Sequence, residues 1–599
     1  MERMGRLIPG DDIMEVGARD RPNGYGIKLL SFRENLTLTR GGHTIKLGTE
    51  IQHTRHPMQI IGDSAVGNYE FDGLGDFLEG DPSLFETGLA AGTPIHGGKL
   101  TAISVPKFHF QQSEFGFYVQ DNFSVTPSLT LNLGLRYEFQ TTPTERDNHA
   151  GSLRSIFDEL LTIGAPFKNP TKKNFSPRVG FAWAPGDQRT SIRGGVGIYY
   201  NPPKIIDWTK QLTTQSPFNV EGLSTDPSLR FPDAFTTQPD LLVGAPIMRY
   251  VEYDQSPTSF YRWSLTVERE QGPWFISAGY TGSRATHLWA DYEANASRWD
   301  GWPNDVPSGE KHFQASNGLI APLFSRITLF SAAGNSFYHG LTLNVLRRLS
   351  AGLQLQFAYS YSKAIDEASG MGDSEGFPQS QGTAYYWDKA MTRGRASFDI
   401  RNNSVTNLTY DLPRMDLTGV AGVLANGWQV SGILSLADGA AFQLEDEGNS
   451  AQRRAMQRRG IEGLRPNLIP GGNNSPMLGG PDLYYDPTQF VSSVCTGDRV
   501  CRAGDPDYRV GFFGNLGRNT LTGPGLATVD FSLLKNLNLT ETKRFQFRAE
   551  FFNLFNHANF ALPDFSPFLG SGSRDAQAGR ITSTNTTARQ IQLALKFIF

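Results

Sequence analysis

The sequence has no uninterrupted apolar run long enough for a membrane-spanning helix, which needs about 20 predominantly apolar residues. This absence argues against a helical membrane protein. It leaves a membrane barrel open, because barrel strands alternate apolar and polar side chains and each strand adds only a weak hydropathy signal.

Charge excess and an apolar leader are also missing. The net charge is −4, which gives no electrostatic reason to expect a nucleic-acid partner. The first twenty residues contain no apolar h-region and cannot act as a secretory signal as they stand. Disorder is not indicated, because 39% of the residues are hydrophobic and only 19% are charged.

Cysteine is nearly absent. The two cysteines, Cys495 and Cys501, lie in the segment CTGDRVC. Their spacing is too wide for CxxC redox chemistry, and no second pair could complete a zinc site. We predict a small loop disulfide, which implies an oxidising compartment. Two free thiols are the alternative.

What the sequence does contain is alternation, and the last eleven residues, 589–599, show it best. The apolar side chains fall on every second position, which predicts a strand with one apolar and one mostly polar face. About ten tilted residues of this kind cross a membrane in a barrel, whereas the alternative is a half-buried edge strand of a soluble sheet. The apolar positions are Ile591, Leu593, Leu595, Phe597 and Phe599.

The same alternation recurs upstream in pairs of segments that are mostly joined by tight turns, and the chain is rich in Phe (41), Gly (64) and Tyr (20), which suits strands and turns. In Leu129–Thr142, six apolar side chains would share one face of a strand but would scatter around a helix. The expected pairs are Ile27–Thr39 with His43–Arg55, Phe108–Val125 with Leu129–Thr142, Phe175–Ala184 with Arg189–Tyr200, Phe260–Gln271 with Trp274–Arg284, Ser336–Leu349 with Leu353–Lys363, Ala396–Leu412 with Trp428–Ala437 through a looser link, and Ala527–Leu539 with Arg544–Phe555; 589–599 stands alone.

Long segments rich in Gly, Pro, Asn and Ser separate these pairs. Seven structureless connections of this size would argue against the strand assignment in a compact soluble domain. In an outer-membrane barrel, short periplasmic turns alternate with long extracellular loops. The pattern therefore predicts an all-β fold, a large antiparallel transmembrane barrel. The long segments are 56–106, 143–173, 201–258, 286–335, 366–394, 442–526 and 557–588.

The strand count predicts an incomplete barrel. We count fifteen strands, and the first visible strand would run downward from outside. Complete bacterial barrels have an even number of strands. We therefore expect an N-terminally truncated chain with a poorly defined segment 1–25 and a barrel over 26–599, in which strands 27–39 and 589–599 either pair directly or leave a gap.

Several motifs, in order, resemble the barrel signature of TonB-dependent outer-membrane receptors of the Oar-like type. The resemblance extends from about residue 25 to the end. It is carried by FGFYVQDNFSVTPSLTLNLGLRYEF (115–139), FSPRVGFAWAPGDQRTSIRGGVGIYYNPP (175–203), GLQLQFAYSYSKAIDEA (352–368), GNLGRNTLTGPGLATVDFSLLKNLNL (514–539), FRAEFFNLFNHANF (547–560) and the terminal RQIQLALKFIF.

The resemblance implies a 22-stranded, plugged barrel, of which about seven strands would be unaccounted for. Members of the family also carry a signal peptide, a small carboxypeptidase-regulatory-like β-sandwich, and a plug with a TonB box, none of which is visible in this sequence. It implies as partners outer-membrane lipid and lipopolysaccharide, the TonB complex acting through the plug, and an extracellular ligand. The barrel-assembly machinery would recognise the terminal strand with Phe599.

Three polar clusters invite a binding site, and we reject each. His53 and His56 in HTRH have no carboxylate at ligand spacing and lie where a strand enters a loop. The acidic segment 366–376 fails the calcium-loop register, and it lacks the spacing of a dinucleotide motif. The basic cluster suits a solvated face or a lipopolysaccharide contact better than nucleic acid; it comprises Arg453, Arg454, Arg458 and Arg459.

Other polar and aromatic positions suit a barrel wall. The N-x-[ST] sites at Asn35, Asn122, Asn407 and Asn538 fall in or beside strands, which argues against glycosylation. Inward-facing Arg136, Glu138, Arg548 and Glu550 need only face water or a plug. The groups Tyr199–Tyr200 and Tyr385–Tyr386–Trp387 suit interfacial girdles or loop packing equally.

The sequence therefore favours an uptake receptor in the outer membrane of a Gram-negative bacterium. Long external loops would capture a ligand, and no cofactor, metal or catalytic residue is expected. A structural or adhesion barrel without transport is the alternative. An outer-membrane hydrolase would need a Ser/His or paired carboxylate set, and no spacing supports one; no G-x-S-x-G segment is present.

Overall fold

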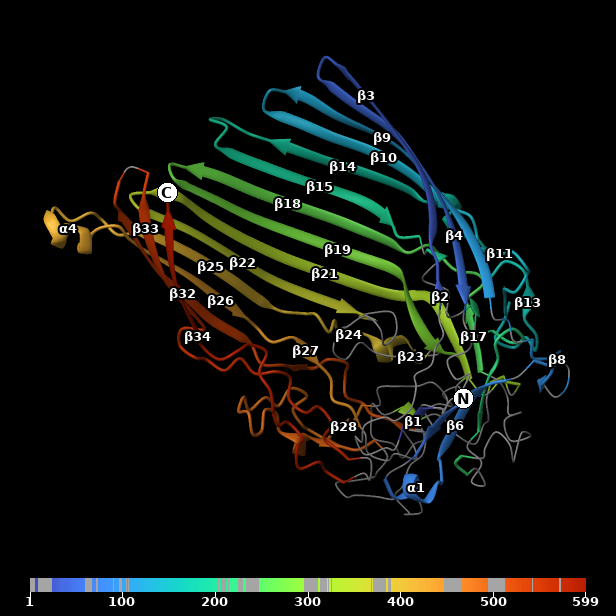
Figure 1. Ribbon diagram of the computed structural model, residues 1–599. Helices are drawn as coiled ribbons and strands as arrows, with labels where there is room; N and C mark the ends of the chain where they lie inside the picture. The colour runs from blue at the N-terminus through green and yellow to red at the C-terminus, as the bar shows by residue number, and fades with distance from the viewer. Residues whose placement is uncertain are drawn as a thin grey trace.

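One antiparallel sheet dominates the computed structural model and curls into a barrel wall (Figure 1). The structure describes residues 24–59, 107–202, 247–295, 326–367, 389–446, 465–493, 512–569 (without 541) and 573–599. It also describes shorter stretches within 6–8, 67–105, 204–232, 311–324, 369 and 384–385. All fifteen expected long strands are present, and each pairs antiparallel with the next.

These long strands follow chain order around the wall, and most successive pairs are joined at one end by the tight turns that the sequence predicts. They are β3 (Lys28–Arg40), β4 (His43–Gln59), β9 (Lys107–Thr126), β10 (Leu129–Gln140), β14 (Phe175–Trp183), β15 (Thr190–Tyr200), β18 (Ser259–Gln271), β19 (Trp274–Glu293), β21 (Arg326–Ser350), β22 (Leu353–Asp366), β25 (Asn402–Asp411), β26 (Trp428–Ala437), β32 (Leu526–Asn538), β33 (Arg544–Phe552) and β34 (Gln590–Ile598).

Some expected boundaries were wrong. Residues 396–401 lie outside the strand, and β25 begins at Asn402, because this stretch follows the short strand β24 (Gly394–Arg395) and then turns. The segment 553–555 forms a turn after β33. At the long-loop end, β19 extends to Glu293 and β21 begins at Arg326. Both strands are longer than predicted because they continue to pair with each other there.

Side chains alternate across this wall as predicted. Leu133 lies opposite Val179, and Val179 lies opposite Val196 on the next strand. These three side chains are 43%, 52% and 60% exposed, so the described part of the chain places no second layer of protein over them. Arg136 faces the other way, opposite Ser176. We call the apolar face the outer face and the polar face the lumen face.

The wall is interrupted between its first and last strands. Among the described strands, β3 forms ladder hydrogen bonds only with β4, and β34 forms them only with β33. Leu30 on β3 and Leu595 on β34 are 74% and 71% exposed, and the two strands stand apart in Figure 1. Of the two expected outcomes, the gap is the one observed.

The long segments are not structureless, which corrects the expectation. Residues 6–8 of the N-terminal segment join a small sheet with segments from three other parts of the chain. The shorter elements are β1 (Arg6–Ile8), β2 (Gly24–Tyr25), β5 (Asn68–Glu70), α1 (Leu74–Glu79), β6 (Leu84–Gly88), β7 (Pro94–Ile95), β8 (Leu100–Thr101), β11 (Thr144–Glu145), β12 (Gly151–Ser152), β13 (Thr162–Ile163), β16 (Glu221–Ser224), β17 (Ile247–Val251), β20 (Lys311–His312), β23 (Ala384–Tyr385), β24, α4 (Gly419–Ala425), β27 (Ala441–Phe442), β28 (Asn467–Leu468), β29 (Phe490–Val491), β30 (Phe512–Phe513), β31 (Leu521–Thr522) and the 3₁₀ turns Thr171–Lys173, Lys389–Thr392 and Pro487–Gln489.

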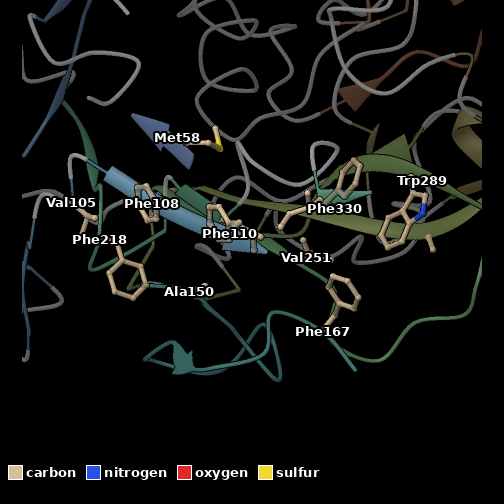
Figure 2. Packing of buried hydrophobic residues seen from close by; sticks show 13 residues of the cluster. Met58, Val105, Phe108, Phe110, Ala150, Phe167, Phe218, Val251, Trp289 and Phe330 are labelled. Carbon is tan, nitrogen blue, oxygen red and sulfur yellow. The ribbon is translucent and has the colours of Figure 1, made fainter. Parts of the chain in front are cut away.

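The buried hydrophobic residues gather at the long-loop end. In one cluster, Phe108 and Phe110 stack with ring centroids 5.7 Å apart, and Trp289 stacks on Phe330 at 5.1 Å (Figure 2). Three further clusters are built mainly from residues of the long connecting segments. No helix in the described part of the chain is long and apolar enough to cross a membrane.

Candidate functional site

A recess of about 800 Å³ opens on the wall formed by β4, β9, β10, β14, β15 and β18. Its floor is lined by glycines, which leave the backbone uncovered because they have no side chain. Gly180 lies opposite Gly195 across the ladder, and Gly197 lies opposite Arg178. The lumen-facing glycines are Gly134, Gly180, Gly195 and Gly197.

Four cations surround this floor: Lys46, Arg136, Arg178 and Arg262. Arg136 is neutralised, because its guanidinium lies 2.9 Å from Glu138 and 3.5 Å from Glu50. Among the described residues, Lys46, Arg178 and Arg262 have no carboxylate within ion-pair distance. The recess therefore carries uncompensated positive charge.

Arg178 is held in place by an aromatic ring. Its guanidinium carbon lies 4.3 Å from the centroid of Tyr199, and that of Arg262 lies 5.6 Å from the same ring. A cation over an aromatic face is attracted by the ring quadrupole. Arg178 Nε is buried and has no hydrogen-bond partner among the described residues. Tyr199 faces the lumen, so the girdle interpretation of Tyr199 is wrong.

A second, mixed-charge recess of about 300 Å³ adjoins the first and shares Arg136. Arg33 lies 2.7 Å from Glu50, and Gln52 Nε2 donates to the same carboxylate at 2.7 Å. Arg33 and Arg136 of this neighbouring recess form ion pairs with Glu50 and Glu138. Lys46, Arg178 and Arg262 of the glycine-floored recess have no such partner among the described residues. The contrast makes the glycine-floored recess the stronger candidate for binding an anionic group.

One group of His, Asp and Glu side chains in the described residues has the proximity of a metal site. Ligand atoms of His109, Glu145 and Asp147 lie within 4.8 Å of one another. Both carboxylates already have partners. The backbone N–H groups of His109, Asp147 and His149 donate to Glu145 at 2.8, 2.8 and 2.9 Å. A hydrogen bond from Arg146 holds the pKa of the Asp147 carboxyl below its usual value. The cluster therefore organises the turn after β11.

A model of the outer membrane beta barrel domain family matches residues 11–592. The chain belongs to this family. Together with the uncovered apolar outer face, membership places the protein in the outer membrane of a Gram-negative bacterium. None of the curated proteins matches the chain.

The chain is also similar to solved outer-membrane proteins. The outer membrane transporter YddB from Escherichia coli is 11% identical, with a TM-score of 0.47, covering 99% of this chain and 57% of that one. The siderophore receptor PirA from Acinetobacter baumannii is 11% identical, with a TM-score of 0.44 and coverages of 96% and 55%. FpvA of P. aeruginosa bound to heterologous pyoverdines is 11% identical, with a TM-score of 0.40 and coverages of 96% and 48%. The barrel spans about half the length of these chains.

The polar clusters rejected from the sequence are placed as follows in this outer-membrane barrel. His53 and His56 lie within β4, which continues past the predicted end, and they point to opposite faces because their positions differ by three. His53 contacts Ser113 Oγ at 2.9 Å, and His56 Nδ1 contacts the Gly26 carbonyl at 2.9 Å. Asp366, at the start of the acidic segment, pairs with buried Arg518 at 2.6 Å.

The terminal strand of the barrel has the predicted faces. Ile591, Leu593, Leu595 and Phe597 lie opposite Phe551, Ala549, Phe547 and Phe545 of β33, and Phe599 is 88% exposed. Arg548 and Glu550 point to the lumen face, opposite Ala594 and Gln592. Asn35, Asn122, Asn407 and Asn538 lie within strands.

Several predictions fall outside the described residues. These are the Cys495–Cys501 disulfide, the arginines Arg453, Arg454, Arg458 and Arg459, most of the acidic segment, and Tyr386–Trp387. The recess itself was not predicted, because Lys46, Arg178 and Arg262 meet only through the register of non-adjacent hairpins. The available signal was that each lies on the polar phase of its own strand.

Proposed function

We propose that this barrel is the wall of a TonB-dependent uptake receptor. Its external segments capture a ligand, and a plug domain that responds to TonB would act within the lumen. Assembly by the barrel-assembly machinery, through the strand that ends at Phe599, and contact of the outer face with lipid and lipopolysaccharide belong to the same proposal. No covalent chemistry is required of the chain, and a non-enzymatic role follows.

The single observation that carries the proposal is the uncompensated positive charge of the glycine-floored recess. A purely structural wall needs polar lumen residues only to face water, and paired charges such as Arg33 with Glu50 satisfy that need. The unpaired cations Lys46, Arg178 and Arg262 are more positive charge than a structural wall requires. Clustered charge of one sign in a low-dielectric cleft raises the local concentration of ions of the opposite sign. We infer that the lumen favours anionic groups.

The charge of the recess is tested by the ion selectivity of the reconstituted chain. In planar bilayers with a KCl gradient, the reversal potential should indicate preference for chloride, and Arg178→Gln with Arg262→Gln should shift it toward potassium. Arg189→Gln, in the exposed turn before β15, is the control and should leave the potential unchanged. Equal selectivity in the double variant and the parent would refute the assigned role of the recess.

Dependence on TonB separates uptake from adhesion. Cells that carry the full protein should lose ligand accumulation when TonB is deleted, while binding of cells to a surface should be unchanged by that deletion. Surface binding without TonB-dependent accumulation would favour the structural or adhesion barrel. This outcome would leave the charge of the recess unaffected.

A further inference from the structure

The link between β25 and β26 differs from the other connections at the short-turn end. It runs from Leu412 to Gly427 and contains the seven-residue helix α4. The helix projects outward from the wall at that end (Figure 1). The asparagine Asn426 closes the link, because Met415 N–H donates to its Oδ1 at 2.6 Å and its Nδ2 donates to the Met415 carbonyl at 3.0 Å.

A lysine fastens this helix to the outer face. Lys535 of β32 lies opposite Trp428 of β26 and opposite Phe547 of β33, which places it on the apolar face of the wall. Its ammonium donates to the carbonyl oxygens of Val423 at 2.7 Å and Leu424 at 3.0 Å, and to that of Asn426. Only 4% of the residue is exposed.

This contact gives hydrogen-bond partners to the Lys535 ammonium and to the carbonyls at the end of α4, and lipid could supply partners to neither. The last carbonyls of a helix have no partners within the helix, and a cation at that end is favourable. An ammonium on a lipid face is costly unless protein groups solvate it. Trp428 completes the arrangement: its indole N–H donates to the Leu424 carbonyl at 2.8 Å, and Lys535 Nζ lies 4.9 Å from its ring centroid.

The other side of the link is apolar and uncovered. Val420, Val423 and Leu424 are 76%, 58% and 63% exposed, and Met415 and Leu417 are 59% and 48% exposed. Exposed apolar patches of this kind mark an interaction surface. The patch continues the apolar outer face of β26 and β32, which the membrane covers, and Trp suits the interfacial depth at which it lies.

We propose that α4 is an interfacial anchor that inserts its apolar side chains into the lipid layer at the short-turn end of the barrel, with Lys535 as the residue that positions it. The occupant of the patch is lipid, the acyl and headgroup boundary of that leaflet. The strength with which a segment binds a membrane interface rises with the apolar area that it buries there. Neither transport nor the recess is needed for this role.

The test uses spin labels on the full chain in vesicles of phosphatidylcholine with phosphatidylglycerol, in a background carrying Cys495→Ser and Cys501→Ser. A label at Val420→Cys should collide several-fold more with oxygen than with a water-soluble nickel chelate, as should a label at Leu133→Cys on the outer face. A label at Thr542→Cys, in the neighbouring turn, should show the opposite preference. If the label at 420 behaves as the label at 542 does, the proposal fails. If neither quencher reaches it, protein covers the patch, and the proposal fails equally.

The positioning role of Lys535 has its own readout. Lys535→Met keeps an apolar side chain on the outer face but removes the ammonium that holds the helix carbonyls. The label at 420 should then gain mobility and access to the nickel chelate, while heat-modifiable migration on gels shows that the barrel has folded. Lys543→Met, in the exposed turn after β32, is the matched control and should change neither. Unchanged accessibility in a folded Lys535→Met variant would contradict the assignment.

Discussion

Gly197 has no side chain where two neighbouring side chains meet. A Cβ at this position would lie 3.1 Å from Arg178 Cγ and 3.1 Å from the Tyr199 ring. The bare backbone therefore lets the guanidinium stack on the ring, and a single residue shapes the charged side of the recess.

We expect Gly197→Ala to destabilise the barrel by about 1 kcal/mol, at the low end of overpacking costs, because both neighbours must shift by a few tenths of an ångström. Gly134→Ala is the control, since its nearest atoms would lie at ordinary contact distances of 3.8 and 3.9 Å. The free energy of unfolding from urea titrations in vesicles measures both. Equal stability of the two variants would show that the Arg178–Tyr199 stack tolerates the added methyl group.

At the loop end, Asp486 links stability to pH. Its side chain accepts hydrogen bonds from Thr488 N–H at 2.9 Å and Thr488 Oγ1 at 2.6 Å, and from Gln489 Nε2 at 2.9 Å. The hydrogen bonds from Thr488 lower the pKa of this carboxyl, and burial opposes them.

Because the folded pKa lies below the unfolded value of about 3.9, the carboxylate stabilises the fold above that pH, and the contribution is lost as the pH falls through the lowered pKa. Proteolysis of segment 465–493 should therefore accelerate on acidification more in the parent than in Asp486→Asn. Asp482→Asn, at an exposed position nearby, should keep the parent's profile. If Asp486→Asn kept the parent's profile, Asp486 would not be the source of the pH dependence.

At the scale of elements, strands were predictable and their surroundings were not. Period-two alternation alone locates β10 and β34, since it is a local property of the sequence. The extension of β21 to 25 residues depends on pairing with β19, and the packing of Tyr69 against Phe231, with ring centroids 5.1 Å apart, joins distant segments. Such contacts leave no periodic signal. The recess was missed for the same reason, because it requires the register of β4, β14 and β18.

The faces of β34 give a direct test of the lipid-facing assignment. We expect Leu593→Arg to cost about 2–4 kcal/mol, since a charged side chain on the lipid face of a barrel is penalised near the midplane. Ala594→Arg points to the lumen and should cost much less. Folding yields into vesicles, read from heat-modifiable gel migration, compare the two. Equal costs would contradict the outer and lumen faces assigned here.

At the scale of the whole molecule, the interruption between β3 and β34 predicts uneven protection of the backbone. Among the strands that the structure describes, β3 and β34 are each paired on one side only, whereas β18 is paired on both sides, by β15 and β19. Backbone N–H groups that are unpaired at a sheet edge exchange their hydrogens with solvent readily or pair with another strand. Hydrogen exchange in detergent should therefore be faster over 28–40 and 590–598 than over 259–271. Equal protection would mean that further strands cover the two edges.

The packed clusters at the long-loop end determine which of these segments could be exchanged with those of another barrel. Tyr69 packs against Phe85 and Phe231 and so joins their segments. The cluster that contains these three residues includes no residue of the fifteen long strands. Replacing one of these segments with that of another barrel should therefore preserve its structure only when its packing partners are replaced with it. Grafts that respect the clusters should keep their shape, and grafts that cut through them should collapse.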